Sequence, residues 1–250
     1  MSNERLRAAL VKSGMTMLEL SETVTVDVKT VERWITTGRT PHARTRQAVC
    51  ATLGADETHL WPDAFSEARS VAATKAELVA FHLNRNAIPA SRWLDLARTA
   101  ERNIDILAFA ASFLHDSLDG FFDIVADRAR EGVKVRLLFG DPDSAAAKLR
   151  GEEEGIGDGL AHRCALTWTY LAPYLEIPNI EARKHGSTLY NSIYRFDDVM
   201  MVNTHALGAP ASRSPMLEFH NLPGGRVYSH YASSLAFAWE RATHLNKVGD

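Results

Sequence analysis

The chain has 250 residues, of which 46% are hydrophobic and 24% charged, and its formal net charge at pH 7 is −3. These values are those of an ordinary globular protein, and no run of apolar residues approaches the roughly 20 that a membrane-spanning helix needs. Cys50 and Cys164 are its two cysteines, which excludes a disulfide framework or a cysteine metal cluster. We expect a cytoplasmic protein with no cofactor and no bound metal.

The charge is unevenly distributed along the chain. Residues 1–50 hold eight of the 28 Lys and Arg side chains but only five of the 31 Asp and Glu side chains. The rest of the chain is therefore acidic, and the first fifth is basic. A local basic excess of this kind is compatible with binding a polyanion through one small region.

The first 60 residues show a succession of short helices. Residues 3–14 have apolar side chains at helical spacing and end at Gly14. Thr16 is placed to cap a second helix in a capping box with Glu19, and Asp27 to cap a third. Two short helices joined by a tight turn and followed by a basic tail form a helix-turn-helix arrangement.

Residues 3–61 resemble the lambda-repressor-like DNA-binding domains of the Xre/Cro family. The strings "GMT", "L-S-E", "KTV-RW" and "G-x-x-P" stand in register with the family's pattern, and "LGADETHLW" is similar to its closing helix pair. Thr25 stands where the family usually has the glycine of the turn, so a left-handed backbone there would be strained. Met17 replaces a glutamine that often contacts phosphate.

The resemblance implies that the helix at 27–36 enters the major groove of double-stranded DNA. Lys29 and Arg33 are then the candidates for guanine, and the basic tail meets phosphates. The expected DNA-contacting residues are Thr16, Val28, Lys29, Thr30, Glu32, Arg33, Arg39, Thr40, His42 and Arg44. The alternative is a three-helix interaction module with a solvated basic face.

The remainder of the chain predicts an α/β domain. We expect the helix-turn-helix domain at 1–65, a linker or connecting helix at 66–90, and the α/β domain at 91–250. Its first clear unit is a strand "IDILAFA", a helix "FFDIVADRAREG" and a strand "VKVRLLFGDPDS". This order predicts parallel neighbours with a right-handed crossover, and a ligand crevice at the carboxyl ends of the strands.

The loops that follow these two strands contain the polar residues Ser112, His115 and Asp141. A helix after them ends in the acidic triplet "EEE" at 152–154. We interpret the triplet as a solvated helix face rather than a carboxylate site.

Residues 189–205 read "LYNSIYRFDDVMMVNTH", which predicts two strands joined at an acidic turn. With the strand "IEARKH" before it, this hairpin resembles half of a phospholipase D fold, whose motif is H-x-K-x4-D-x6-G-S-x-N. When its aspartate is aligned with Asp197, the histidine falls on Tyr190 and the lysine on Ser192. Thr204 and His205 replace the Gly-Ser pair, and Leu207 replaces the asparagine.

These replacements indicate a domain without phosphodiesterase chemistry. In the family the histidine forms a phosphoenzyme bond and the lysine holds phosphate charge. Tyr190 is a weak nucleophile near neutral pH, since a tyrosine has an ordinary pKa of about 10, and Ser192 carries no charge. We therefore predict no catalytic residues.

Strand alternation places Tyr190, Ser192 and Tyr194 on one face, toward the cleft of phospholipase-type sites. Aromatic walls with convergent polar groups suit a small polar ligand or a nucleotide. The expected ligand-binding residues are Asp141, Arg150, His185, Tyr190, Ser192, Tyr194, Asn203 and His205. The alternative is a satisfied hydrogen-bond network that holds the hairpin.

Residues 75–245 as a whole resemble a domain of unassigned function that follows this kind of helix-turn-helix in many bacterial regulators. Because the chain has one phospholipase-D-like half, a homodimer would restore the pair and match two half-sites of a palindromic operator. We predict a dimeric transcriptional regulator with a ligand-sensing α/β domain. The alternatives are a DNA-targeted phosphodiesterase or nuclease that uses His185 or His205, and a constitutive DNA-binding dimer whose second domain is only a scaffold.

Overall fold

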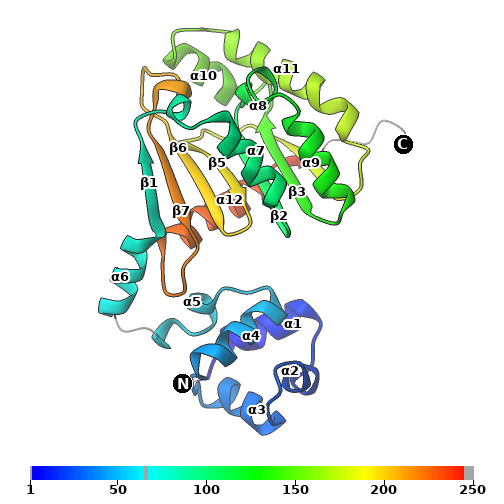
Figure 1. Ribbon diagram of the computed structural model, residues 1–250, viewed down its shortest axis with the longest axis vertical. Helices are drawn as coiled ribbons and strands as arrows, with labels where there is room; N and C mark the ends of the chain where they lie inside the picture. The colour runs from blue at the N-terminus through cyan, green and yellow to red at the C-terminus, as the bar shows by residue number, and fades with distance from the viewer. Residues whose placement is uncertain (1, 65–66, 245–250) are drawn as a thin grey trace. The chain divides into compact units, whose positions relative to one another are not determined.

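The structure, a computed structural model, describes residues 2–64 and 67–244 (Figure 1). The chain forms two compact units, and each is described by itself. The first holds the described residues up to Ala76 together with Leu222–Ser229, and the second holds Glu77–Asn221 and the described residues from His230 onward. No helix in the described ranges has the length and apolar character needed to span a membrane.

The first unit is helical. Its elements are α1 (Glu4–Ser13), α2 (Met17–Thr23), α3 (Val28–Thr36), α4 (Ala43–Leu53), α5 (Glu57–Leu60), the 3₁₀ turn η1 (Pro62–Ala64) and α6 (Glu67–Glu77). The predicted caps are confirmed: Gly14 ends α1 with φ 70°, Thr16 and Glu19 form a capping box, and Asp27 caps α3. Local capping chemistry thus sets the boundaries of the helix-turn-helix.

The turn between α2 and α3 contains a backbone conformation that favours glycine. Thr25 has φ 55°, in the left-handed region, where a β-branched side chain is strained. The expected consequence of the missing glycine is therefore present in the structure.

A single apolar core holds the first unit together. Trp34 of α3 meets Trp61, which follows α5, edge to face with ring centroids 6.4 Å apart. The buried members of this core are Leu6, Leu10, Leu20, Val31, Trp34, Ile35, Val49, Leu60 and Trp61. The closing helices α4 and α5 therefore complete the core around which α2 and α3 are held.

The second unit is built on a mixed sheet that has eight strands within the described residues. In sheet order they are β1 (Leu78–His82), β7 (Met216–His220), β6 (Val199–Thr204), β5 (Asn191–Phe196), β2 (Asn103–Ala108), β3 (Lys134–Gly140), β4 (Ile180–His185) and β8 (Thr243–His244). Strands β2, β3 and β4 are parallel, and the other pairs are antiparallel. The predicted parallel pairing of β2 and β3 is confirmed.

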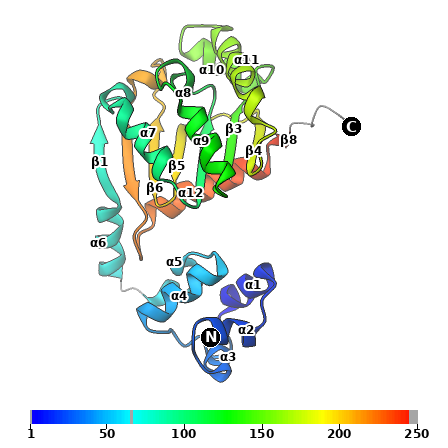
Figure 2. The ribbon, with the colours of Figure 1, turned by 45° about the vertical axis from the view of Figure 1, so that its right-hand side comes forward.

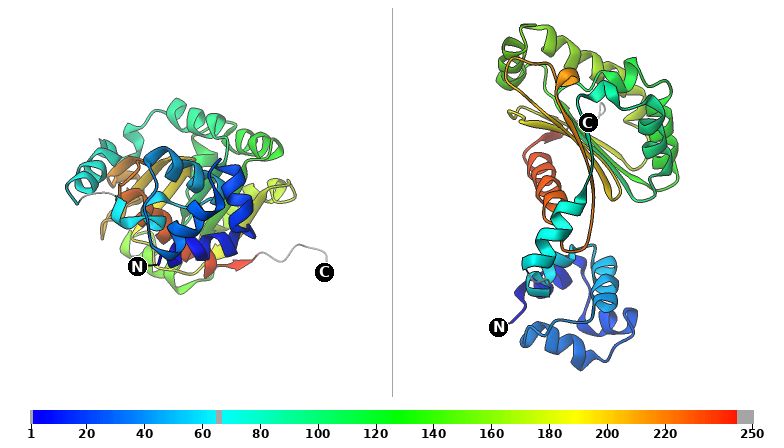
Figure 3. Two further views of the ribbon diagram at one scale, coloured as in Figure 1. Left: turned by 90° about the horizontal axis from the view of Figure 1, so that it is seen from below. Right: turned by 60° about the vertical axis from the view of Figure 1, so that its left-hand side comes forward.

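Helices cover both faces of this sheet (Figures 2 and 3). The helices of the second unit are α7 (Ala90–Thr99), α8 (Phe113–Asp116), α9 (Phe121–Arg130), α10 (Ala145–Glu153), α11 (Gly159–Leu171) and α12 (Val227–Glu240), with 3₁₀ turns η2 (Arg85–Ala87), η3 (Ala172–Tyr174) and η4 (Ala211–Arg213). Residues of α7 and α9 pack on one face with Ile104, Ile106, Leu137 and Tyr194, while Trp239 of α12 lies on the other face over Arg136 and Arg183. The expected fold class, a helical unit followed by a mixed sheet flanked by helices, is confirmed.

Several elements were not expected from the sequence. The range 66–90, expected as a linker or connecting helix, holds both α6 and the edge strand β1, and the boundary between the units falls after Ala76. Helix α11 and the short strand β8 were also not predicted. Strand β1 pairs with β7, which lies more than 130 residues later in the chain, so nothing local in the sequence specifies it.

Candidate functional site

The outer face of α3 is the first candidate site. Val31, Trp34 and Ile35 are buried, whereas Val28, Lys29, Glu32 and Arg33 are exposed and Thr30 is half-buried. The structure therefore brings the expected groove-reading residues onto one solvent-facing surface. The strong amphipathic character of the sequence Val28–Thr36 explains this division.

The start of α2 is less free than the sequence suggests. The Thr16 hydroxyl and backbone N–H both donate to the Glu19 carboxylate at 2.8 Å, and these hydrogen bonds lower the pKa of Glu19. Thr16 thus lies beside a fixed negative charge. Its contact with phosphate stays a prediction.

The basic stretch after α3 divides into two parts. Arg39, Thr40, His42 and Arg44 are exposed, as a phosphate-contacting tail would require. Arg46 instead lies in the interior, where it pairs with Glu57 at 2.5 Å and donates to the Pro41 carbonyl at 2.6 Å. Arg46 therefore joins α4 to α5 and adds nothing to the basic surface.

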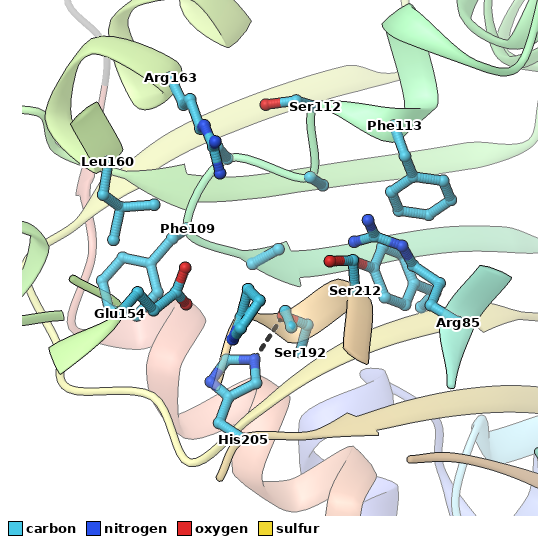
Figure 4. Close-up of a pocket in the computed structure, with 16 residues that line it drawn as sticks. Arg85, Phe109, Ser112, Phe113, Glu154, Leu160, Arg163, Ser192, His205 and Ser212 are labelled. Atoms are coloured by element: carbon cyan, nitrogen blue, oxygen red, sulfur yellow. Dashed lines mark hydrogen bonds between the residues drawn. The ribbon is translucent and has the colours of Figure 1, made fainter. Parts of the chain in front are cut away.

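The second candidate site is a pocket of about 100 Å³ at the carboxyl end of β2 (Figure 4). The loop after β2 forms one wall, β5 and the residue after β6 form the floor, and the ends of α10, α11 and η4 complete the rim. The side chains that define it are Arg85, Phe109, Ser112, Phe113, Glu154, Leu160, Arg163, Ser192, Tyr194, His205 and Ser212. The crevice expected at the ends of the parallel strands is therefore present.

The floor of the pocket is a hydrogen-bonded pair, Ser192 and His205. Ser192 Oγ lies 3.0 Å from His205 Nε2, and His205 Nδ1 lies 3.2 Å from the Leu189 carbonyl oxygen. Because a carbonyl oxygen only accepts, Nδ1 carries the ring proton and Nε2 accepts the Ser192 hydroxyl proton. The backbone of the hairpin thus fixes both the tautomer and the orientation of the imidazole.

The imidazole of His205 is held in its neutral form. Burial lowers its pKa to about 4; the hydrogen bond to the Leu189 carbonyl opposes this shift, the positive charge of Arg150 adds to it by a smaller amount, and Glu153 opposes it least. Burial likewise raises the pKa of Tyr194, which the nearby Arg85 partly offsets. At neutral pH the floor therefore consists of uncharged hydrogen-bonding groups.

The positive charge of the pocket comes from two arginines on different segments. Arg85 stacks over the Phe113 ring with its Cζ 4.1 Å from the ring centroid, and Arg163 projects from α11 on another side (Figure 4). The carboxylate that lines the pocket, Glu154, is paired with Arg150 at 2.8 Å. The two guanidinium groups therefore leave the lining with a positive balance.

The interpretation of the acidic triplet is wrong for Glu154. Its side chain is 8% exposed and buried against Arg150, whereas Glu152 is exposed. Arg150 also donates to the carbonyls of Ala206 and Ala209 at 3.5 and 2.9 Å. Arg150 thus does not line the pocket but holds the loop that follows His205.

The prediction that Tyr190 faces the pocket is wrong. The strand begins at Asn191, so strand alternation does not extend to Tyr190, and its side chain is 81% exposed. Ser192, Tyr194 and His205 do line the pocket as expected.

The remaining expected ligand residues have structural partners. His185 is buried with Nε2 3.0 Å from the Ala108 carbonyl, and burial lowers its pKa. The Asn203 amide donates to the carbonyls of Ser214 and Pro215. Asp141 Oδ1 lies 3.9 Å from Lys184 Nζ, and Asp141 does not line the pocket. The alternative of a hydrogen-bond network that holds the hairpin therefore describes Asn203 and His185 better than a ligand site does, although Asn203 Oδ1 and His185 Nδ1 have no partner in that network.

The turn aspartate Asp197 has an architectural role. Its carboxylate accepts the backbone N–H groups of Glu101, Arg102 and Asn103 at 2.7, 2.9 and 2.8 Å. It therefore ties the hairpin to the start of β2. The backbone of Asp197 has φ 52°, a left-handed conformation that aspartate tolerates better than most other residues.

Sequence reasoning missed Arg85, Arg163 and Ser212 as pocket residues. Arg85 and Arg163 lie on elements that the sequence did not predict, η2 and α11, and Ser212 lies in the turn η4. No periodic pattern or motif marks them. Across the described ranges, no group of three or more His, Cys, Asp or Glu side chains is arranged to hold a metal ion.

Comparison with known proteins gives similarity only at the level of structure. No family model and no curated protein matches the chain. The archaeal chromatin protein TrmBL2, whose structure is described as showing a novel mode of DNA binding, is 15% identical with a TM-score of 0.41, covering 68% of this chain and 55% of that chain. This chain therefore spans just over half the length of TrmBL2.

Two bacterial proteins are similar to this chain at a comparable level. Nuc from Salmonella typhimurium, a phospholipase D family member, is 13% identical with a TM-score of 0.38, covering 67% of this chain and 99% of that chain. NucT from Helicobacter pylori is 12% identical with a TM-score of 0.38, covering 62% and 89%. The function of this chain is therefore inferred from the geometry of its own sites.

Proposed function

We propose that the protein is a dimeric, sequence-specific DNA-binding transcriptional regulator of the Xre/Cro type. Its helical unit reads an operator, and its phospholipase-D-like unit binds a small polar effector without cleaving it. The observation that carries the DNA-binding part is the outer face of α3, on which Lys29 and Arg33 lie exposed one helical turn apart.

The residue types on α3 support reading of the major groove. Arg33 and Lys29 are suited to the O6 and N7 acceptors of guanine, and Val28 to a thymine methyl group. Arg39 and Arg44 follow as exposed cations suited to phosphates. Glu32 on the same face adds discrimination, because a carboxylate accepts from cytosine and is repelled by phosphate.

The test begins with selection of bound sequences from random double-stranded DNA. Arg33→Ala is then titrated against the selected site, and the matched control is Arg7→Ala, which removes an exposed arginine of α1. We expect Arg33→Ala to weaken binding about tenfold to a hundredfold and to relax base preference at one position of each half-site. No enrichment of any sequence by the wild-type protein would contradict the proposal.

The pocket supports binding of a small anionic effector. Arg85 and Arg163 supply positive charge, while the Ser192 and His205 pair and the Tyr194 hydroxyl supply neutral hydrogen-bonding groups. An effector changes operator binding only if its affinities differ between two arrangements of the protein. We propose that filling the pocket shifts the placement of the two DNA-reading units.

Native mass spectrometry of the purified protein tests for a co-purified molecule. Thermal stability is then measured with a series of anions from inorganic phosphate to a nucleoside monophosphate, in the wild type, in Arg163→Ala and in the control Arg98→Ala, which removes an exposed arginine of α7. We expect stabilisation that is lost in Arg163→Ala alone. If no anion binds, the constitutive DNA-binding dimer with a purely structural second unit is the better description.

The hydrogen bond from Ser192 to His205 favours a second candidate, a DNA-targeted phosphodiesterase or nuclease. A base that accepts a hydroxyl proton is the arrangement that activates a serine nucleophile. Against this, a pKa of about 4 makes His205 a weak base at neutral pH, and buried His185 does not line the pocket. Incubation with plasmid and with a generic aryl phosphodiester decides: hydrolysis that is lost in His205→Ala would establish the enzyme.

A further inference from the structure

The outer strand β1 presents an open backbone edge. Among the described strands it pairs with β7 alone, through Ala80 opposite Glu218 and Phe81 opposite Leu217. Figures 1 and 2 show no other element alongside its outer side. The opposite edge of the sheet is β8, which has two residues in the described chain. The sheet thus has one long open edge.

This edge lacks the lysine and proline residues that often keep monomeric sheets from associating. Solvent-facing edge strands usually contain proline, or charged residues such as lysine. The segment 78–83 reads "LVAFHL" and has no such residue. Its exposed fractions are 46% for Leu78, 53% for Val79, 58% for Phe81 and 76% for Leu83.

One irregularity is present at the start of the strand. The register with β7 shifts between Leu78 and Ala80, as in a β-bulge. From Ala80 to His82 the pairing is regular, so the free N–H and C=O groups of this part can form a second ladder. Phe81 lies in this regular part and Leu83 directly follows the strand, and both side chains are exposed.

We propose that β1 pairs antiparallel with β1 of a second copy of this chain, joining the two sheets across a two-fold axis. The inference deepens the proposed function and rests on its dimeric state, for which it names the interface. Antiparallel pairing of a strand with its own copy is self-complementary and closes at two subunits. Pairing of β1 with β8 of another copy would be heterologous and open-ended, and β8 offers two residues within the described chain.

The symmetry of this interface restricts which side chains meet. Opposed residues of an antiparallel pair lie on the same face of the sheet. When both strands have the same sequence, one residue must therefore lie opposite its own copy. A pairing centred on Phe81 places the two rings opposite each other, whereas one centred on Ala80 places Phe81 opposite Val79; in either case exposed apolar area of Phe81 is covered.

The first test is the mass of the protein in solution, measured by size-exclusion chromatography with light scattering. We expect the wild type to have twice the chain mass of 27.7 kDa and the variant Phe81→Lys/Leu83→Lys to be a monomer with an unchanged circular dichroism spectrum. The control Leu207→Lys places a charge on another leucine, 81% exposed in a loop, and should remain a dimer. A monomeric wild type, or a dimeric edge variant, overturns the proposal.

Disulfide trapping gives a second measurement that does not depend on weakening the interface. Burial raises the pKa of both Cys50 and Cys164 to about 12, so the native thiols react slowly near neutral pH. Single cysteines are introduced as Ala80→Cys, Phe81→Cys and His82→Cys, with Val11→Cys, at a 78% exposed position of α1, as the control. We expect at least one edge position to cross-link quantitatively under mild oxidation, and equal slow cross-linking at all four positions would refute the paired edge.

The outcome separates this inference from the proposed function. If the wild type binds a selected DNA site and the Phe81→Lys/Leu83→Lys variant is still a dimer, the proposed interface is wrong and the proposed regulator stands. If the chain dimerises through β1 and selects no DNA sequence, the interface stands and the regulator is wrong.

Discussion

Acidification should destabilise the α/β unit through His205. Its pKa is about 4 in the folded protein against an ordinary value of 6.5, so the unfolded chain takes up a proton first as the pH falls. Stability is therefore complete above pH 6.5 and is lost progressively toward pH 4. Linkage gives a loss of about 2 kcal/mol between pH 7.5 and pH 5, on the order of 3 kcal/mol when both states are protonated.

Urea denaturation at several pH values measures this loss. A background of Trp34→Phe and Trp61→Phe leaves tryptophan fluorescence to the α/β unit, so the helical unit does not contribute to the signal. His205→Gln keeps an acceptor for Ser192 but cannot be protonated, and we expect its stability to fall less than that of the wild type by about 2 kcal/mol at pH 5. The control His162→Gln removes an exposed imidazole of α11 and should keep the wild-type slope.

The difference in pH dependence between the wild type and His205→Gln isolates the contribution of His205 to the stability. His185 is also buried with a lowered pKa, so the wild type and His205→Gln share its contribution, which cancels in their difference. Identical pH dependence of the wild type and His205→Gln would mean that the imidazole is solvated or charged in the folded state. The conclusion that the floor of the pocket is uncharged at neutral pH would then be wrong.

Two further pairs of substitutions test the backbone. Thr25→Gly should raise the stability of the helical unit by about 1 kcal/mol because it relieves the left-handed strain at φ 55°, whereas Thr23→Gly in α2 should lower it, as thermal denaturation would show. Gly151→Ala should cost at least about 2 kcal/mol, because its Cβ would lie 2.0 Å from the Gly157 carbonyl oxygen, whereas Gly159→Ala, with 3.5 Å to the nearest atom, should be tolerated. Equal stability of the two alanine variants would contradict the close approach that joins α10 to α11.

The helical unit was predictable from sequence because its signals are local. A cap and the amide that it satisfies lie two or three residues apart, as do Thr16 and Glu19, or Asp27 and Lys29. The glycine missing at Thr25 predicted strain, and the positive φ is found there. Exposure on α3 followed from the helical period.

The α/β unit was predictable where a strand is apolar along its length or where a turn signal joins two strands. The pairing of β2 with β3 followed from the connection between them. Strand β1 was missed because its partner β7 is distant in sequence, and Tyr190 was misplaced because the period-two rule was extended one residue beyond the start of β5. A pattern gives the face of a residue only within the element that contains it.

The polar residues of this unit illustrate why candidate sites need geometry. Asp105 is 1% exposed and accepts hydrogen bonds from Arg136 at 2.6 Å and from Arg195 at 3.2 Å. Arg136 in turn contacts the ring of Trp239, so this group lies on the face of the sheet that α12 covers. Asp197 ties the hairpin to β2. Both carboxylates accept several hydrogen bonds that join neighbouring strands, so their structural partners account for their positions.

The charge and the hydroxyl of the pocket come from separate parts of the chain, and this separation favours binding over cleavage. Ser192 stands where a lysine would combine charge with position, and the cations come instead from Arg85 and Arg163 on η2 and α11. Catalysis of phosphodiester cleavage needs a base whose pKa is near the working pH, whereas burial holds the pKa of His205 at about 4. This separation of charge and proton acceptor is the basis on which we propose that the pocket binds an anion rather than cleaving it.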